Sequence, residues 1–90
     1  MERSACLLFR CTDQIGIIAE LVLFFRDLNV SICRFEEYTD SQYFFARLEW
    51  RGDHPWATTE AFDEAFQPTA DAFDSASFSA HFFELSLIHI

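Results

Sequence analysis

The period of the apolar positions changes along the chain, and each period predicts a different element. Residues 5–11 form a short apolar run that is typical of a strand. Residues 17–28 instead place their apolar side chains on one helical stripe, and Asn29 is expected to end that helix in a left-handed conformation. The side chains expected on the buried face are Ala5, Leu7, Phe9 and Cys11 of the strand and Ile18, Leu21, Val22, Phe25 and Leu28 of the helix.

Two further strands, residues 30–39 and 43–51, are expected to form a hairpin around a turn at residues 39–42. The later strand alternates cleanly and places Phe44, Ala46, Leu48 and Trp50 on one face. The earlier strand alternates poorly, so its pattern leaves open which face is buried.

A second helix is expected after Gly52. Pro55 suits a first helical turn, and Thr58 or Thr59 can cap the helix. Pro68 either kinks this helix or splits it in two, because proline removes a backbone hydrogen bond. Residues 77–83 alternate again and predict the last strand. The side chains expected inside are Phe62, Phe66, Thr69 and Phe73 of the helix and Phe78, Ala80 and Phe82 of the strand.

The predicted element order is β-α-β-β-α-β, which indicates an α+β, ferredoxin-like fold. In such a fold two helices cover one face of a four-stranded antiparallel sheet. We expect one domain over residues 1–84. Residues 85–90 fit the pattern less well and are interpreted as a tail or the start of a linker.

Composition and charge narrow the possible partners. The formal net charge is −9, from 15 acidic residues against 6 arginines, so nucleic acid and anionic membranes are not expected as partners. No apolar run approaches the roughly 18 residues of a membrane span, and residues 1–10 do not resemble a signal peptide. A cytoplasmic protein is therefore expected. Cys6, Cys11 and Cys33 lack metal-ligand spacing and are expected to be buried, reduced thiols.

Candidate catalytic groups are scattered. His54, His81 and His89 are expected at the surface or at strand ends, without the spacing of metal ligands. Glu36 and Glu37 are adjacent on a strand, so they face opposite ways and cannot act as a paired acid and base. No nucleophile or phosphate-binding motif is present, and no metal or other cofactor is expected. The chain carries no catalytic constellation of its own, and whether it belongs to an enzyme stays open on this ground.

Residues 11–18 are the most suggestive segment. A strand runs into an acidic turn, then Gly16, then the start of a helix, and Asp13 can cap that helix. Unpaired backbone N–H groups and the positive end of the helix dipole favour a small carboxylate at such a junction. The alternative is an ordinary strand–helix turn with an aspartate cap.

The same segment carries a family resemblance. Residues 8–19 are similar to the opening "C-P-D-x-x-G-I-[IV]-A" of ACT domains, with Thr12 in place of the usual proline. Residues 43–50 resemble the "R-F-F-M-R-x-E-[FW]" strand of formyltetrahydrofolate deformylases, and residues 65–73 resemble their "F-x-P-[IVL]-A-x-x-F" helix end. The chain thus resembles the N-terminal ACT domain of that family.

The resemblance implies a regulatory role. The intact enzymes hydrolyse 10-formyltetrahydrofolate to tetrahydrofolate and formate, a step of one-carbon metabolism that serves purine biosynthesis. Their formyltransferase-like catalytic domain would follow residue 90, so no catalytic residue can be assigned here. The resemblance also implies a small amino acid effector, glycine or methionine, bound at a subunit interface. By motif position the effector-binding residues are Asp13, Gln14, Ile15, Gly16, Ile17, Asn29 and Val30.

A homodimer is expected as well, with Phe35, Tyr43 and Phe45 on the sheet face that the helices leave open. Two alternatives remain. One is a free-standing ACT regulator that acts by protein contact, like the regulators of glycine cleavage. The other is an interaction module without a ligand, whose strand–helix turn is only structural.

Overall fold

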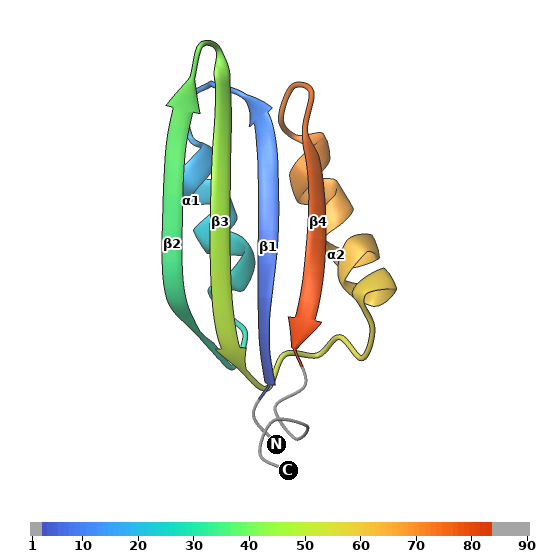
Figure 1. Ribbon diagram of the computed structural model, residues 1–90. Coiled ribbons are helices and arrows are strands. Elements are labelled where there is room, and N and C mark those ends of the chain that lie inside the picture. The colour runs from blue at the N-terminus through green and yellow to red at the C-terminus, as the bar shows by residue number, and fades with distance from the viewer. Residues whose placement is uncertain (1–2, 84–90) are drawn as a thin grey trace.

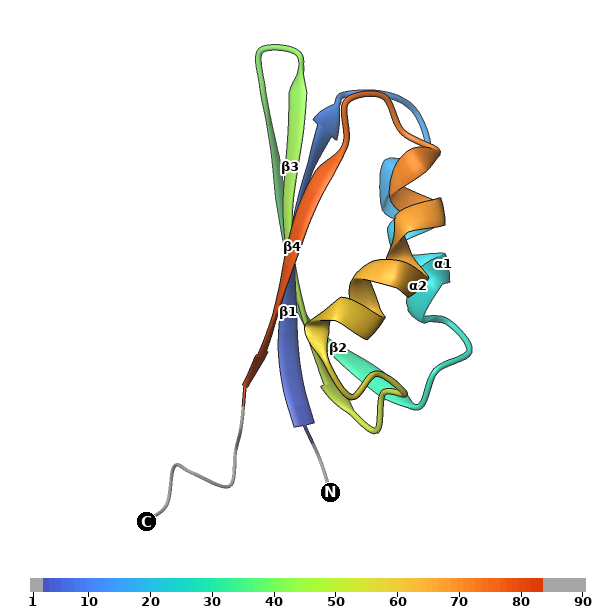
Figure 2. The same ribbon diagram turned by 90° about the vertical axis from the view of Figure 1, so that its right-hand side faces the viewer.

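The computed structural model describes residues 3–83 as one antiparallel sheet with both helices on a single face (Figure 1 and Figure 2). The strand order is β2-β3-β1-β4, which confirms the predicted ferredoxin-like arrangement. In chain order the elements are β1 (Arg3–Thr12), α1 (Ile17–Phe25), β2 (Val30–Asp40), β3 (Tyr43–Gly52), α2 (Thr59–Asp71) and β4 (Ser77–Phe83). The predicted tail, residues 85–90, lies outside the described residues.

The buried face of the sheet follows the predicted alternation. In the central strand β1, Leu7 and Phe9 are buried, and in β3 they are matched by Leu48 and Ala46, their direct partners across the ladder. Partners that face each other across an antiparallel ladder share one side of the sheet. The register therefore places the buried apolar side chains of the two inner strands, β1 and β3, next to one another on the face that the helices cover.

Helix α1 is rotated relative to the prediction. Its buried side chains are Ile17, Leu21 and Phe25, while Ile18 and Val22 are 46% and 40% exposed. The helix begins directly after Gly16, so the row spaced by four residues from Ile17 faces the sheet. The prediction for Ile18 and Val22 was wrong because it started the apolar stripe one residue too late.

The end of α1 also differs from the prediction. The helix ends at Phe25, and its C-cap Arg26 has right-handed backbone angles. Among the described residues, positive φ angles outside glycine occur only at Ser41 and Ser75. Asn29 is therefore not a left-handed cap, and it forms part of the connection that leads into β2.

A β-bulge between Ile32 and Arg34 explains the poor alternation of β2. The register with β3 shifts there, so Phe35 lies opposite Leu48 and packs against the core. An extra residue in one strand reverses which face the following side chains occupy. Phe35 is thus on the helix side, and its predicted place on the open face was wrong. Phe45, which pairs with Arg10 and Tyr38, does lie on the open face.

Helix α2 runs through Pro68 as one helix, so the predicted split is wrong, and Figure 2 shows that this helix changes direction along its length. Thr58 caps it, because its Oγ1 accepts a hydrogen bond from the Ala61 N–H at 3.1 Å. Pro55 lies before the helix rather than in its first turn. Pro68 is tolerated on the exposed side, where the backbone carbonyl that loses its N–H partner can bind water. Ala70, not Thr69, is buried between Phe66 and Phe73.

Aromatic rings fill the space between the helices and the sheet. Phe66 is fully buried, and its ring centre lies 5.0 Å from that of Phe24 on α1 and 4.8 Å from that of Phe78 on β4. The Phe9 ring of β1 lies edge-on to it at 6.0 Å. Edge-to-face pairs of this kind contribute beyond the area they bury. Phe66 therefore ties both helices to two strands.

His54 is buried, contrary to the prediction of a surface residue. The Arg3 guanidinium lies 3.2 Å from its Nδ1 and donates hydrogen bonds to the carbonyls of His54 and Trp56. A guanidinium can only donate, so Nδ1 accepts and the proton of the neutral ring sits on Nε2. Burial, and then the charge of Arg3, hold the pKa of His54 below its usual value.

We expect Phe66→Ala to lower the free energy of unfolding by about 3–5 kcal/mol, since it opens a cavity where four elements meet. Chemical denaturation measures this change. The matched control is Phe83→Ala at the end of β4, where the side chain is 44% exposed. A Phe66→Ala loss no larger than that of the control would contradict this view of the core.

His54 makes a pH-dependent contribution to stability. Because the pKa of His54 is lowered in the folded state, only the unfolded chain takes up a proton as pH falls through about 6.5. The contribution is therefore complete above about pH 6.5 and is lost as pH falls toward the lower folded pKa. Unfolding free energies measured from pH 8 to 5 should show a shallower decline for His54→Phe than for the wild type. His81→Gln, which removes an exposed imidazole of β4, is the matched control and should decline like the wild type.

Candidate functional site

A hollow of ≈ 290 Å³ lies at the N-terminus of α1. Its walls come from the turn after β1, the first turn of α1, the helix-facing side of edge strand β2, and β3. The residues that line it are Asp13, Gln14, Gly16, Ile17, Ile18, Ala19, Glu37, Thr39 and Phe44. It is therefore formed by segments far apart in the sequence.

Hydrogen bonds to two other loops fix the turn that forms this hollow. The Thr12 N–H donates to the Asp74 carbonyl at 3.0 Å, and the Asp13 N–H donates to the Gln42 carbonyl at 2.8 Å. Within the turn, Gln14 Nε2 donates to the Thr12 carbonyl at 2.7 Å. The start of α1 is thus anchored to the β2–β3 turn and to the α2–β4 connection.

Gly16 is the N-cap of α1, and no side chain among residues 3–83 caps this helix. Its φ of 91° is in the left-handed region, where a side chain is unfavourable. A Cβ at this position would meet no atom within 4 Å, so the constraint on Gly16 is its backbone angle rather than space. The Asp13 side chain makes no capping hydrogen bond to α1. Its backbone N–H instead donates to the Gln42 carbonyl in the β2–β3 turn.

The hollow combines two kinds of charge. The first N–H groups of α1 carry the positive end of the helix dipole and lack partners within the helix. Asp13 and Glu37, both exposed carboxylates, line the same hollow. This arrangement can accept a small molecule that has both a carboxylate and an ammonium group.

The structure brings together four of the seven predicted effector-binding residues. Asp13, Gln14, Gly16 and Ile17 line the hollow, whereas Ile15 is fully exposed and does not.

Asn29 and Val30 lie at the other end of the sheet. Val30 pairs with Gly52, and the Asn29 carbonyl accepts a hydrogen bond from the Asp53 N–H at 3.0 Å. The turn after β1 instead contacts Gln42 at the β2–β3 turn, and α1 separates the two ends (Figure 1). Within one chain, Asn29 and Val30 therefore do not reach the hollow at Gly16.

Sequence reasoning missed the contribution of β2 to the hollow. Glu37 and Thr39 face the helix side because the bulge between Ile32 and Arg34 reverses the alternation before them. The poor alternation of this strand was the one signal in the sequence, and it could not fix where the extra residue lies.

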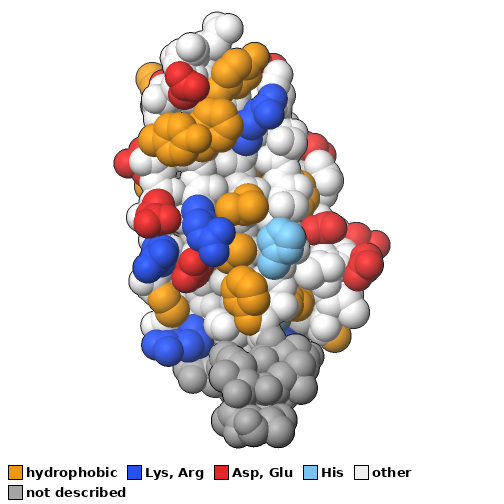
Figure 3. Space-filling view, viewed as in Figure 1, with side chains coloured by type: hydrophobic (Ala, Val, Ile, Leu, Met, Phe, Trp, Pro, Cys, Tyr) orange, Lys and Arg blue, Asp and Glu red, His pale blue; other side chains and the backbone are white. Residues whose placement is uncertain are grey.

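A second, larger hollow of ≈ 820 Å³ lies on the open face of the sheet. Figure 3 shows this face of the molecule. Tyr38 and Phe45 form its aromatic part, with ring centres 4.9 Å apart and planes nearly parallel. Leu8, Arg10 and Arg47 line it as well. This face carries apolar and charged groups side by side.

The described residues do not assemble a catalytic centre. No group of three His, Cys, Asp or Glu side chains among residues 3–83 could hold a metal ion. Glu36 and Glu37 are exposed on opposite faces of β2, and His81 is exposed on β4. His89 lies outside the described residues.

The thiols follow the prediction only in part. Cys6 and Cys11 are buried and unpaired, and burial raises the pKa of each. Cys33 is exposed at the β-bulge, so the prediction that it is buried was wrong.

Neither helix within residues 3–83 is long and apolar enough to cross a bilayer.

Solved structures similar to this chain include formyltetrahydrofolate deformylases and ACT domain proteins. No family model and no curated protein sequence matches it. A deformylase from Pseudomonas syringae pv. tomato is 32% identical with a TM-score of 0.79, over 89% of this chain and 27% of that one. A deformylase from Burkholderia mallei is 20% identical with a TM-score of 0.72, over 88% and 28%. An ACT domain protein from Streptococcus pneumoniae is 12% identical with a TM-score of 0.65, over 98% and 96%.

These similarities confirm the resemblance to ACT domains and to formyltetrahydrofolate deformylases. The chain spans only about a quarter of the length of the deformylases that it matches.

Proposed function

We propose that this chain, which has the fold of a regulatory ACT domain, binds a small amino acid in the hollow at the start of α1. The observation that carries the proposal is the pairing of an uncapped helix N-terminus with two carboxylates in one hollow. A free amino acid has the complementary pair of charges on a single carbon atom.

The proposed binding mode follows from the lining groups. The N–H groups of Ile17, Ile18 and Ala19 would bind the carboxylate, as helix N-termini commonly bind anions. Asp13 and Glu37 would accept hydrogen bonds from the ammonium group. The side chain would then lie toward the apolar wall that Phe44 contributes.

Size also supports a small ligand. The hollow of ≈ 290 Å³ equals about ten times the roughly 30 Å³ that one water occupies in the liquid. Such a volume suits glycine or methionine, the two effectors that the family resemblance implies. Asn29 and Val30 would contribute only if a second copy of the chain supplied them.

We further propose that the domain regulates an enzyme that hydrolyses 10-formyltetrahydrofolate. The support is the 32% identity with the Pseudomonas syringae deformylase over 89% of this chain. The catalytic machinery would lie in a formyltransferase-like domain beyond these 90 residues, and the domain would pair with a second copy in a homodimer.

A free-standing regulator is the second candidate function. It is favoured by one comparison, in which this chain covers 96% of the ACT domain protein from Streptococcus pneumoniae. The fold therefore also occurs as a chain of nearly this length. Determining whether the gene continues into a catalytic domain separates the two candidates.

We expect thermal unfolding to identify the effector. At about 100 times its dissociation constant, a ligand adds roughly 2.7 kcal/mol of stability, which raises the midpoint by several degrees in a domain of this size. Glycine or methionine at about 10 mM should raise the midpoint, and other amino acids should raise it less.

Variants locate the binding site. Glu37→Gln and Asp13→Asn should each reduce the ligand-induced rise in the midpoint, because each removes an acceptor for the ammonium group. The matched control is Glu64→Gln on the exposed side of α2, which changes the net charge equally. A flat response to every amino acid, or equal responses of Glu37→Gln and Glu64→Gln, would contradict the proposal.

A further inference from the structure

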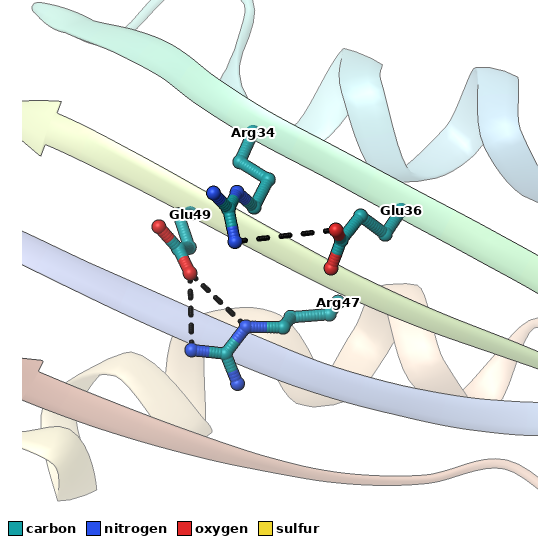
Figure 4. Close-up of polar contacts among 4 residues, drawn as sticks. All are labelled: Arg34, Glu36, Arg47 and Glu49. Carbon is teal, nitrogen blue, oxygen red and sulfur yellow. Dashed lines mark hydrogen bonds and ion pairs between the residues drawn. The ribbon is translucent and has the colours of Figure 1, made fainter.

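Four charged side chains form an alternating square on the open face of the sheet (Figure 4). Within β2, Arg34 Nη1 lies 3.9 Å from Glu36 Oε2, and within β3, Arg47 Nη2 lies 3.0 Å from Glu49 Oε2. Across the ladder, Glu36 pairs with Arg47 and Arg34 pairs with Glu49. Each charge therefore has opposite charges as its nearest neighbours, both along its strand and across it.

Such a square is complementary to a second copy of itself. The square has two rows across the strands, Glu36 with Arg47 and Arg34 with Glu49. Consider a two-fold axis that runs across the strands, parallel to the sheet and midway between the open faces of two copies. If this axis passes between the two rows, the rotation places each row over the other row of the second copy. Arg34 then faces Glu36 of the second copy, and Arg47 faces Glu49 of the second copy. Symmetry repeats both pairs, so four opposite-charge contacts form and no like charges meet.

The neighbouring strand β1 presents one exposed apolar side chain, Leu8, close to the same axis. Leu8 lies in the row of Glu36 and Arg47, because Leu8 pairs with Arg47. Cys6 lies in the next row, because it pairs with Glu49. The rotation that matches the charges therefore also places Leu8, which is 38% exposed, over the row of Cys6 in the second copy, where the Cys6 side chain itself is buried at 2% exposure.

We propose that the open face of the sheet is the interface between two copies of this chain. The helices would lie outside and the two sheets inside, with their strands antiparallel and close to aligned, as in sheet-on-sheet packing. A two-fold axis that runs along the strands, between β2 and β3, would also match the charges. It would leave β1 and β4 without a facing strand in the second copy. The axis across the strands uses all four strands and is the one we propose.

The size of the face sets the expected affinity. Four strands about 4.8 Å apart and about nine residues long give a face of about 19 by 30 Å, so two faces bury roughly 1,100 Å². This is near the lower limit for stable association, so a concentration-dependent dimer is expected. Exposed charges contribute mainly to register and partner choice.

This inference rests on the homodimer in the proposed function and assigns its interface. The amino acid hollow lies on the helix side of the sheet, so dimerisation leaves it accessible. The two can therefore fail separately: thermal shifts with amino acids test the ligand, and the mass of the chain in solution tests the interface.

Sedimentation velocity of the 90-residue chain over a range of concentrations is the first test. The wild type should shift from monomer to dimer, and Arg47→Glu should raise the dimer dissociation constant at least about tenfold, because two like-charge contacts replace two attractive ones. The matched control is Arg26→Glu at the end of α1, outside the open face, which changes the net charge equally. A monomer at every concentration, or equal effects of Arg47→Glu and Arg26→Glu, would overturn the proposal.

Inverting the whole square tests the geometry itself. The fourfold variant Arg34→Glu, Glu36→Arg, Arg47→Glu and Glu49→Arg keeps every pair within the chain and the net charge. It should form dimers with itself, like the wild type. Mixed dimers with the wild type should be depleted, since all four contacts would then join like charges. Energy transfer between labelled chains measures the mixing, and mixed dimers at the statistical proportion would overturn the proposal.

Discussion

The layer of aromatic rings between the sheet and the two helices is the constraint on which the rest of the molecule depends. Phe62 and Phe66 of α2 are fully buried, and the ring of Phe24 on α1 lies edge-on to both and stacks on Trp56. These rings hold both helices on one side of a single sheet. The arrangement leaves the other side of the sheet uncovered by either helix and fixes the start of α1 beside the β2–β3 turn. The two surfaces to which we assign function are therefore consequences of one core.

Much of this architecture was predictable because its signals are local. The clean alternation of β3 gave its buried face, and the Thr58 cap and the spacing of Phe62 and Phe66 gave α2. Features that depend on packing at a distance were not predictable. Whether Pro68 bends α2 or splits it in two was left open by the pattern, and His54 is buried because Arg3, 51 positions away, binds it.

The candidate site shows the same division between local and distant information. The turn with Gly16 was evident from the sequence, because a left-handed residue before a helix favours glycine. The opposing wall was not evident, because Glu37 reaches the hollow only through the bulge between Ile32 and Arg34. A register shift of one residue moves every later side chain of β2 to the other face, and no residue near the bulge specifies its position.

The central claim, that an amino acid binds at the start of α1, is tested most directly by nuclear magnetic resonance of the ¹⁵N-labelled chain during titration with glycine and with methionine. The account predicts that one of them shifts the backbone amide signals of Gly16, Ile17, Ile18 and Ala19 in a saturable way, while signals from the exposed face of α2 stay in place. Signals that do not move with either amino acid, or that move only at Asn29 and Val30, would contradict it.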